Sequence, residues 1–150
     1  WRSPLPPMDQ RRVFGSYSLP LLMATAVALT ESVKNRESDL QKLERLNLDL
    51  RNEIARSLPD FQLIKPEGRI DPRYIALGVP NSAGEELLQN MERLGFLIDA
   101  GSACGAGALS PSHVLDSIGW QGLGHLRLTL KPEHNTSDIA EVIAALKKSV

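Results

Sequence analysis

The sequence has little of several features that would assign a function class at once. It holds a single cysteine among 150 residues, so no internal disulfide can form, and we expect a reducing compartment, the cytoplasm. Its 17 basic and 18 acidic side chains give a formal charge of -1, which provides no electrostatic case for nucleic-acid binding. The most apolar run, residues 19–29, is shorter than the about 20 residues of a membrane span. It also lacks the flanks of a signal peptide, so we expect no membrane segment.

The composition that is present is typical of one globular domain. Apolar residues make up 42% of the chain and charged residues 23%. We expect an irregular segment over residues 1–17, where "SPLPP" favours an extended path, and a single small domain over residues 18–150. A start at Trp1 is unusual for a native chain, and we expect this sequence to be a piece of a longer protein.

Two helices are expected before Pro59. The first begins at Ser18, and because residues 21–32 are apolar nearly all round, we expect it to be buried. The second follows residues 34–38 ("KNRES") and runs to about Leu58. Its apolar stripe would pack on a sheet, with a short coiled coil as the less favoured alternative; the stripe comprises Leu40, Leu43, Leu50 and Ile54.

Strands and helices alternate after Pro59. This order predicts an α/β domain of the α+β two-layer kind, with a small mixed or antiparallel sheet and helices packed on one face. The expected strands cover residues 61–64, 73–79, 96–99 and 125–130. The expected helices cover residues 82–94, 110–118 and 135–149, and Gly95 fits the position just past the end of the helix at residues 82–94.

The lone cysteine, Cys104, lies in the stretch "DAGSACGAGALSPSHVL", residues 99–115. Small residues surround it, and a flexible tether suits a nucleophile that collects a group at one site and delivers it at another. A free thiol has a pKa of about 8.5, so a thiolate needs a nearby cation or helix N-terminus. The helix entered at Ser110 and the imidazole of His113 are candidates. The alternative is that Cys104 is a small buried hydrophobic residue.

Several motifs together resemble one family. "GSAC" followed by "LSPSHVL", Gly84–Glu85, and "HLRLTL" at residues 125–130 are similar to the C-terminal part of the cysteine desulfurases. These are pyridoxal-phosphate enzymes of the class V aminotransferase family. "QRRVFGSYS", residues 10–18, is similar to a further motif of that family.

The resemblance implies the small domain of a fold-type I pyridoxal-phosphate enzyme and a role for each matching residue. Arg127 would bind the α-carboxylate of L-cysteine, for which a planar guanidinium is well suited. Cys104 would take the substrate sulfur as a persulfide, release alanine, and pass the sulfur to an acceptor such as an iron–sulfur scaffold protein. Ser18 would reach the cofactor phosphate of the neighbouring subunit in a homodimer, and it is also placed to cap the first helix.

The resemblance also implies what this chain does not carry. The lysine that forms the Schiff base belongs to the family's large domain, and no lysine here follows the histidine that marks that site. We therefore expect residues 1–17 to be the remnant of a link to a missing large domain. The chain alone should be inactive and bind no cofactor. Two alternatives remain: a class V aminotransferase-like domain without desulfurase activity, and a standalone sulfur-carrier or interaction domain.

The remaining candidate residues favour structural roles. The three histidines have no spacing that builds a metal site with Cys104, so we expect no bound metal. Asp71 and Asp99 are interpreted as turn and strand-end residues. Trp120 is expected to cover the end of the sheet near the cysteine loop, or a partner face.

Overall fold

The computed structural model describes residues 18–65, 67–80, 82, 84–100, 113–120, 122 and 124–150. The chain divides into two compact units, Trp1–Glu37 and Ser38–Val150. The expected irregular segment at residues 1–17 lies outside the described residues. The elements, in order, are α1 (Leu19–Ser57), β1 (Gln62–Ile64), β2 (Tyr74–Val79), α2 (Gly84–Arg93), α3 (His113–Ser117), β3 (Gly124–Thr129) and α4 (Thr136–Ser149).

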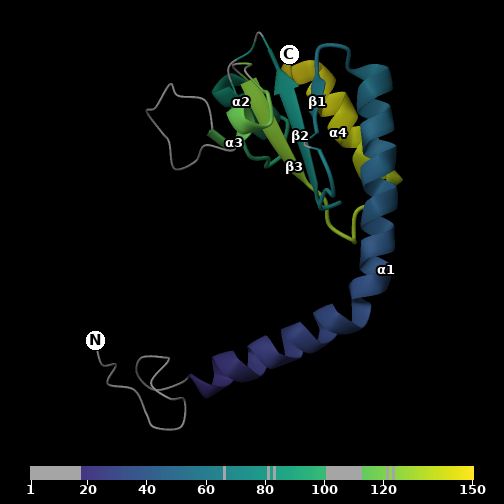
Figure 1. The fold of residues 1–150 in the computed structure, drawn as a ribbon, viewed down its shortest axis with the longest axis vertical. Helices are drawn as coiled ribbons and strands as arrows, with labels where there is room; N and C mark the ends of the chain where they lie inside the picture. Colours follow the sequence, from purple (N-terminus) through teal and green to yellow (C-terminus); the bar gives the residue numbers. More distant parts are fainter. Residues whose placement is uncertain are drawn as a thin grey trace, which may run out of the picture. The chain divides into compact units, whose positions relative to one another are not determined.

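A small antiparallel sheet with the strand order β1-β2-β3 organises the second unit (Figure 1). Ala76 lies opposite Arg127, and Leu77 lies opposite Leu126. Successive side chains of a strand point to opposite faces, so this register divides the sheet into two chemically different sides. Ile75, Leu77 and Val79 point to one side, and Tyr74, Ala76 and Gly78 point to the other. The predicted sheet is confirmed, in its antiparallel form.

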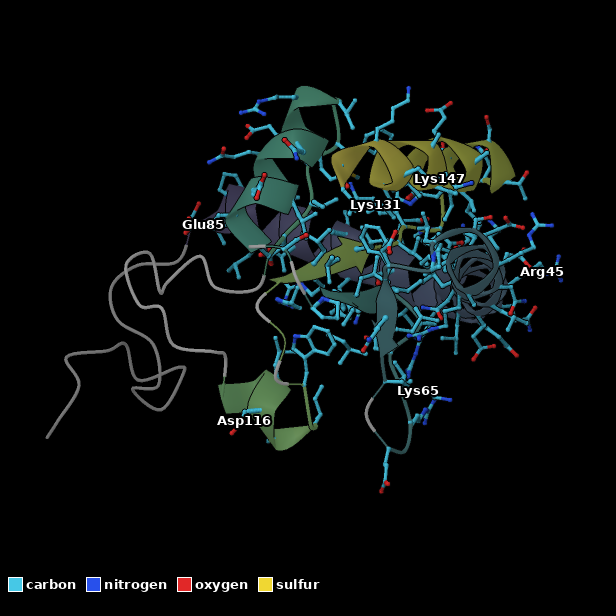
Figure 2. All side chains as sticks on the ribbon, turned by 90° about the horizontal axis from the view of Figure 1, so that it is seen from above. Arg45, Lys65, Glu85, Asp116, Lys131 and Lys147 are labelled. Carbon is cyan, nitrogen blue, oxygen red and sulfur yellow. The ribbon has the colours of Figure 1, made fainter. Side chains whose placement is uncertain are left out.

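The helices α1, α2 and α4 pack on the apolar side of this sheet, as expected, whereas the short helix α3 lies on its other side. Figure 2 shows α2 and α4 above the sheet and α3 below it. The core between the helices and the sheet takes side chains from four sources. The C-terminal half of α1 contributes Leu43, Leu46, Leu50 and Ile54; the strands contribute Ile75, Leu77, Leu126 and Leu128; α2 contributes Leu87 and Met91; α4 contributes Ile139, Ile143 and Leu146. The stripe on α1 therefore packs on the sheet, with Leu40 half-buried at its start.

The prediction of two separate helices before Pro59 is wrong. A single helix, α1, runs from Leu19 to Ser57. The stretch "KNRES" at residues 34–38 contains neither glycine nor proline, so nothing in it ends a helix. Its polar residues lie between the part of the helix whose apolar side chains are exposed and the part whose apolar side chains are buried, and the helix continues through them.

The prediction of a buried first helix is also wrong. The large apolar side chains between Leu19 and Val33 are each at least 49% exposed; they are Leu19, Leu21, Leu22, Met23, Val27, Leu29 and Val33. Burial requires a second surface, and the described residues do not supply one for this part of α1. No helix in the described part of the chain is long and apolar enough to cross a bilayer.

Glycines with positive φ end both short helices of the second unit. After α2, Gly95 (φ +88°) donates to the carbonyl of Glu92 and Phe96 donates to that of Met91, both at 2.9 Å. After α3, Gly119 (φ +82°) and Trp120 form the same pair of bonds to Asp116 and Leu115. Such a pair satisfies the last carbonyls of a helix and turns the chain sharply. The predicted glycine stop of α2 is confirmed.

The turn after α3 delivers Trp120 onto the second side of the sheet. A Cβ atom added to Gly78 of β2 would lie 2.1 Å from the Trp120 ring, so the indole rests directly on the glycine. This contact confirms the prediction that Trp120 covers the end of the sheet. Gly78 is needed here because any side chain would occupy the space of the ring.

The expected strand at residues 96–99 is reduced to one bridge. Asp99 pairs with Arg127 of β3, and residues 96–98 are not in a strand. Phe96 and Ile98 pack against the core, whereas Leu97 is 89% exposed. The packing of Phe96 after the Gly95 turn draws the chain away from the edge of β3, which explains why the ladder does not extend.

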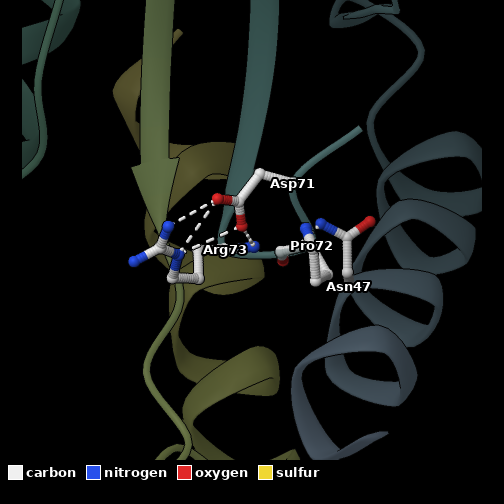
Figure 3. A network of polar contacts seen from close by, with 4 residues as sticks. All are labelled: Asn47, Asp71, Pro72 and Arg73. Atoms are coloured by element: carbon white, nitrogen blue, oxygen red, sulfur yellow. Dashed lines mark hydrogen bonds and ion pairs between the residues drawn. The ribbon is translucent and has the colours of Figure 1, made fainter. Parts of the chain in front are cut away.

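A buried amide joins α1 to the start of β2. The Asn47 side chain donates to the carbonyls of Pro72 (2.8 Å) and Tyr74 (3.2 Å), and its oxygen accepts from Nε of Arg51 (2.7 Å). Figure 3 shows Asn47 facing Pro72, beside the exposed pair of Asp71 and Arg73. Burial lowers the pKa of Arg51. The amide thus satisfies backbone groups that would otherwise be unpaired in a part-buried place.

Replacing this amide should destabilise the second unit. In Asn47→Ala, the carbonyls of Pro72 and Tyr74 and Nε of Arg51 lose their partner, which should cost about 1–3 kcal/mol of unfolding free energy. Denaturant unfolding followed by circular dichroism measures this cost. Asn52→Ala is the matched control, because Asn52 is exposed on the same helix and should cost little. Equal losses in the two variants would contradict the assignment.

A side chain at Gly78 should displace Trp120. Gly78→Val places carbon atoms where the indole lies, so we expect a red-shifted fluorescence of Trp120 and a loss of about 1–3 kcal/mol in stability. The variant is made in a Trp1→Phe background, which leaves Trp120 as the single indole. Gly68→Asn is the control, because a Cβ there meets open space and Asn tolerates positive φ. An unchanged emission maximum in Gly78→Val would refute the contact.

Candidate functional site

The candidate site lies on the side of the sheet opposite the helical core. Tyr74 of β2 and Arg127 and Thr129 of β3 point to this side, since Leu126 and Leu128 alternate with them and face the core. Trp120 covers the same side at Gly78, toward the other end of β2. The side chains of Tyr74 and Arg127 remain exposed beyond it.

Arg127 is held by Asp99 at both backbone and side chain. The backbone N–H of Asp99 donates to the carbonyl of Arg127 at 3.3 Å, and the N–H of Arg127 donates back to Asp99. Directly opposed residues of this kind present their side chains on one face. Nη2 of Arg127 accordingly donates to the Asp99 carboxylate, with the two side chains 47% and 37% exposed. The guanidinium is thereby oriented but stays accessible.

Tyr74 lies between two guanidinium groups. The carbon at the centre of the Arg127 guanidinium is 5.7 Å from the ring centroid, and that of Arg73 is 5.6 Å away. Both distances are in the range of cation–π attraction. Arg73 is itself bound by Asp71, at 2.6 Å from Nη2 to the carboxylate, and this bonding lowers the pKa of Asp71. Asp71 therefore serves the turn before β2, as expected, and also pairs with Arg73.

His125 is the half-buried titratable group beside this pair. Burial lowers the pKa of His125, and a hydrogen bond to the backbone of Ala100 opposes that effect in part. Gly84, at the start of α2, lies against the backbone of His125, 3.4 Å from its carbonyl oxygen to the position of a Cβ. His125 is thus a neutral packing residue next to Asp99 and Arg127.

The structure places the three predicted site residues in different ways. Arg127 is on the open side of the sheet. Ser18 is exposed directly before α1, in the other unit, and its carbonyl accepts from the N–H of Leu22 at 3.0 Å. This bond begins the helix, and within the described part of the chain the Ser18 side chain forms no cap. Cys104 lies outside the described residues, as does the loop that contains it.

Two residues of the site were missed by sequence reasoning. The sequence predicts Asp99 only as a strand-end residue and predicts no role for Tyr74. In the structure both residues contact Arg127. Asp99 and Arg127 are 28 residues apart, so no local pattern relates them. One signal is available in the sequence. Asp99 ends the expected strand at residues 96–99, and that strand was expected to lie in the same sheet as the strand that carries Arg127.

The described residues do not form a complete cofactor or metal site. No group of histidine, cysteine and acidic side chains among them could hold a metal ion. Pyridoxal phosphate is held in enzymes through a lysine Schiff base. A cavity of about 490 Å³ is lined in part by Arg127, and no lysine is among its described lining residues. The lysines lie on α1 and α4, after β1 and after β3; they are Lys34, Lys42, Lys65, Lys131, Lys147 and Lys148. The described residues do place the guanidinium of Arg127 where it can bind a carboxylate.

The comparisons with known proteins agree with this arrangement. No protein-family model matches the sequence. The cysteine desulfurase IscS of Clostridium botulinum is 31% identical over 128 residues, which are 82% of this chain and 32% of that protein. The putative cysteine desulfurase IscS 1 of Bacillus subtilis is 22% identical over 142 residues, which are 95% of this chain and 38% of that protein. The chain therefore spans about a third of the length of these curated relatives.

A solved structure shows the same fold. The NifS-like protein from Rickettsia africae superposes on 94% of this chain with a TM-score of 0.77 and 17% sequence identity, and the match takes up 37% of that protein. The helical layer and antiparallel sheet thus match the fold of part of this NifS-like protein. The chain is therefore similar, over most of its length, to about a third of these cysteine desulfurases.

Proposed function

We propose that this chain is the C-terminal small domain of a pyridoxal-phosphate-dependent cysteine desulfurase, and that it supplies two working groups. Arg127 binds the α-carboxylate of L-cysteine, and Cys104 receives its sulfur. The observation that carries the proposal is the exposed guanidinium of Arg127 on the open side of the sheet, oriented by Asp99. The curated relatives named above are cysteine desulfurases, which supports this activity over an aminotransferase-like one.

Arg127 suits the substrate because most of the hydrogen-bond donors of its guanidinium are not used by Asp99. Asp99 accepts a hydrogen bond from Nη2, while a guanidinium has five N–H donors. The remaining donors can bind a second carboxylate in a bidentate manner. Tyr74 supports the guanidinium from its ring face. The pairing with Asp99 thus fixes the direction of the side chain before substrate arrives.

The chemical step assigned to this chain is a sulfur transfer to Cys104. The thiolate attacks the sulfur atom of L-cysteine, an S–S bond forms, and the C–S bond of the substrate breaks. The electron pair of that bond stays with the substrate, which takes up a proton and leaves as alanine. The cofactor, held by the rest of such an enzyme, supplies the electron sink for cleavage. A second protein then takes the sulfur from the Cys104 persulfide.

Further parts of the proposal concern the assembled enzyme. Ser18 would contact the cofactor phosphate of the neighbouring subunit in a homodimer. The sulfur acceptor would be a scaffold protein for iron–sulfur clusters. A reducing compartment such as the cytoplasm would keep the Cys104 thiol free for the reaction.

A chimeric enzyme tests the activity directly. We expect the chain alone to form no alanine from L-cysteine and no visible Schiff-base band with pyridoxal phosphate. Joined to the remaining part of the Clostridium botulinum relative in place of its own C-terminal part, it should form alanine. Cys104→Ala should abolish alanine formation in the chimera and remove the persulfide seen by mass spectrometry. A chimera that keeps its turnover after Cys104→Ala would contradict the role of the thiol.

The role of Arg127 is tested by a charge-conserving change. Arg127→Lys keeps the positive charge but loses the bidentate fork, so KM for L-cysteine in the chimera should rise by about tenfold or more. Arg73→Lys is the matched control, because Arg73 flanks the same tyrosine but is bound by Asp71. It should leave KM unchanged. Equal effects of the two substitutions would show that Arg127 acts only through packing on Tyr74.

A further inference from the structure

The outer edge of β3 is open beyond Asp99. The sheet order makes β3 an edge strand, and a single bridge, between Asp99 and Arg127, lies on its outer side in the described chain. The N–H of Leu130 donates to Arg73, on the inner side, at 2.7 Å. Backbone groups alternate in direction along a strand, so the N–H and C=O of Thr129 point outward like those of Arg127. No backbone partner for Thr129 on that side occurs among the described residues.

A cavity of about 490 Å³ lies where the ladder stops. Continued antiparallel pairing from Asp99 and Arg127 would put Leu97 opposite Thr129, but residues 96–98 leave the edge. The lining of the cavity includes Phe96 and Leu97, from the segment that leaves the edge, and Val142 of α4. An apolar cavity with an outward backbone donor and acceptor at its edge fits an added β-strand.

The charged side chains that line the cavity favour an added strand that carries a positive charge. Arg127 is the single lysine or arginine among the described lining residues, and Asp99 pairs with it. Asp138 and Glu141 of α4 then leave the lining with an excess of negative charge. Asp138 already accepts a hydrogen bond from the backbone of Asn135, at the start of α4. Glu141 is exposed and is the group best placed to meet a cation.

We propose that this cavity binds an extended peptide segment of a partner protein, with alternate apolar side chains and a flanking basic residue. The segment adds to β3 at Thr129, its apolar side chains fill the space between Leu97 and Val142, and its lysine or arginine meets Glu141. The inference does not depend on desulfurase activity, since it uses neither Cys104 nor the free donors of Arg127.

The test uses the full 150-residue chain and the synthetic peptide Ac-KTVTVTK-NH2, in which alternation places both valines and both lysines on one face of the strand. Fluorescence anisotropy with a labelled peptide gives the affinity, and two-dimensional NMR maps the amide shifts. We expect saturable binding with a shift of the Thr129 amide, and binding at least about tenfold weaker for Ac-ETVTVTE-NH2, because a favourable charge contact becomes repulsive.

Two variants separate the edge from the charge. Thr129→Pro removes the outward N–H, a change that an edge strand tolerates, and Glu141→Lys reverses the charge of the lining. Each should weaken binding by about tenfold or more. Glu133→Lys, an exposed change outside the cavity, should not. If Thr129→Pro fails to fold, Glu141→Lys still decides.

Several outcomes would overturn the proposal. These are no binding of the basic peptide, equal binding of the acidic one, affinity unchanged in both variants, or amide shifts confined to another surface. Light scattering that shows a dimer, with the Thr129 amide protected in it and exposed in the monomer, would assign the edge to a second copy of this chain instead.

Discussion

The antiparallel pairing of β2 with β3 is the interaction on which the rest of this domain depends. It sets Ile75 and Leu77 beside Leu126 and Leu128 on the helical side, and Tyr74 beside Arg127 on the other. A shift of one residue would turn Arg127 into the core and expose leucines, at a cost that the buried area makes prohibitive. The same hydrophobic contacts that hold α1, α2 and α4 on the sheet therefore place Arg127 on the open side of the sheet.

Glycine and small residues place the remaining parts against that sheet. The turn at Gly119 brings Trp120 onto Gly78, where the missing side chain leaves room for the ring. The turn at Gly95 brings Phe96 into the core and so pulls the chain off β3 before Asp99 returns to pair with Arg127. One deviation in the backbone thus produces both the single bridge that orients Arg127 and the cavity next to it.

Local pattern predicted most of the elements but not their limits or partners. The alternation in "HLRLTL" identified β3, and the stripe Leu43, Leu50, Ile54 identified the packed half of α1. The prediction of a helix end at the polar residues 34–38 is wrong, because polar side chains indicate exposure to solvent and do not by themselves end a helix. The exposure of Leu19 to Val33 could not be foreseen from the helix itself, since burial depends on a partner surface. Arg127 was identified by resemblance, whereas Asp99 and Tyr74 depend on contacts between distant segments.

The pairing of Arg127 with Asp99 has a consequence for the proposed binding of a carboxylate substrate. An arginine already neutralised by an internal acid attracts an anion from solution less than a free one does, because the two fields partly cancel. The compensation is orientation. Asp99 holds the backbone and Nη2 of Arg127, and the ring face of Tyr74 lies against its guanidinium, so the side chain loses little entropy when a second carboxylate binds. An exposed pair contributes little to stability on its own. The pair therefore serves to direct the guanidinium, at the expense of a weaker long-range attraction for the proposed carboxylate substrate.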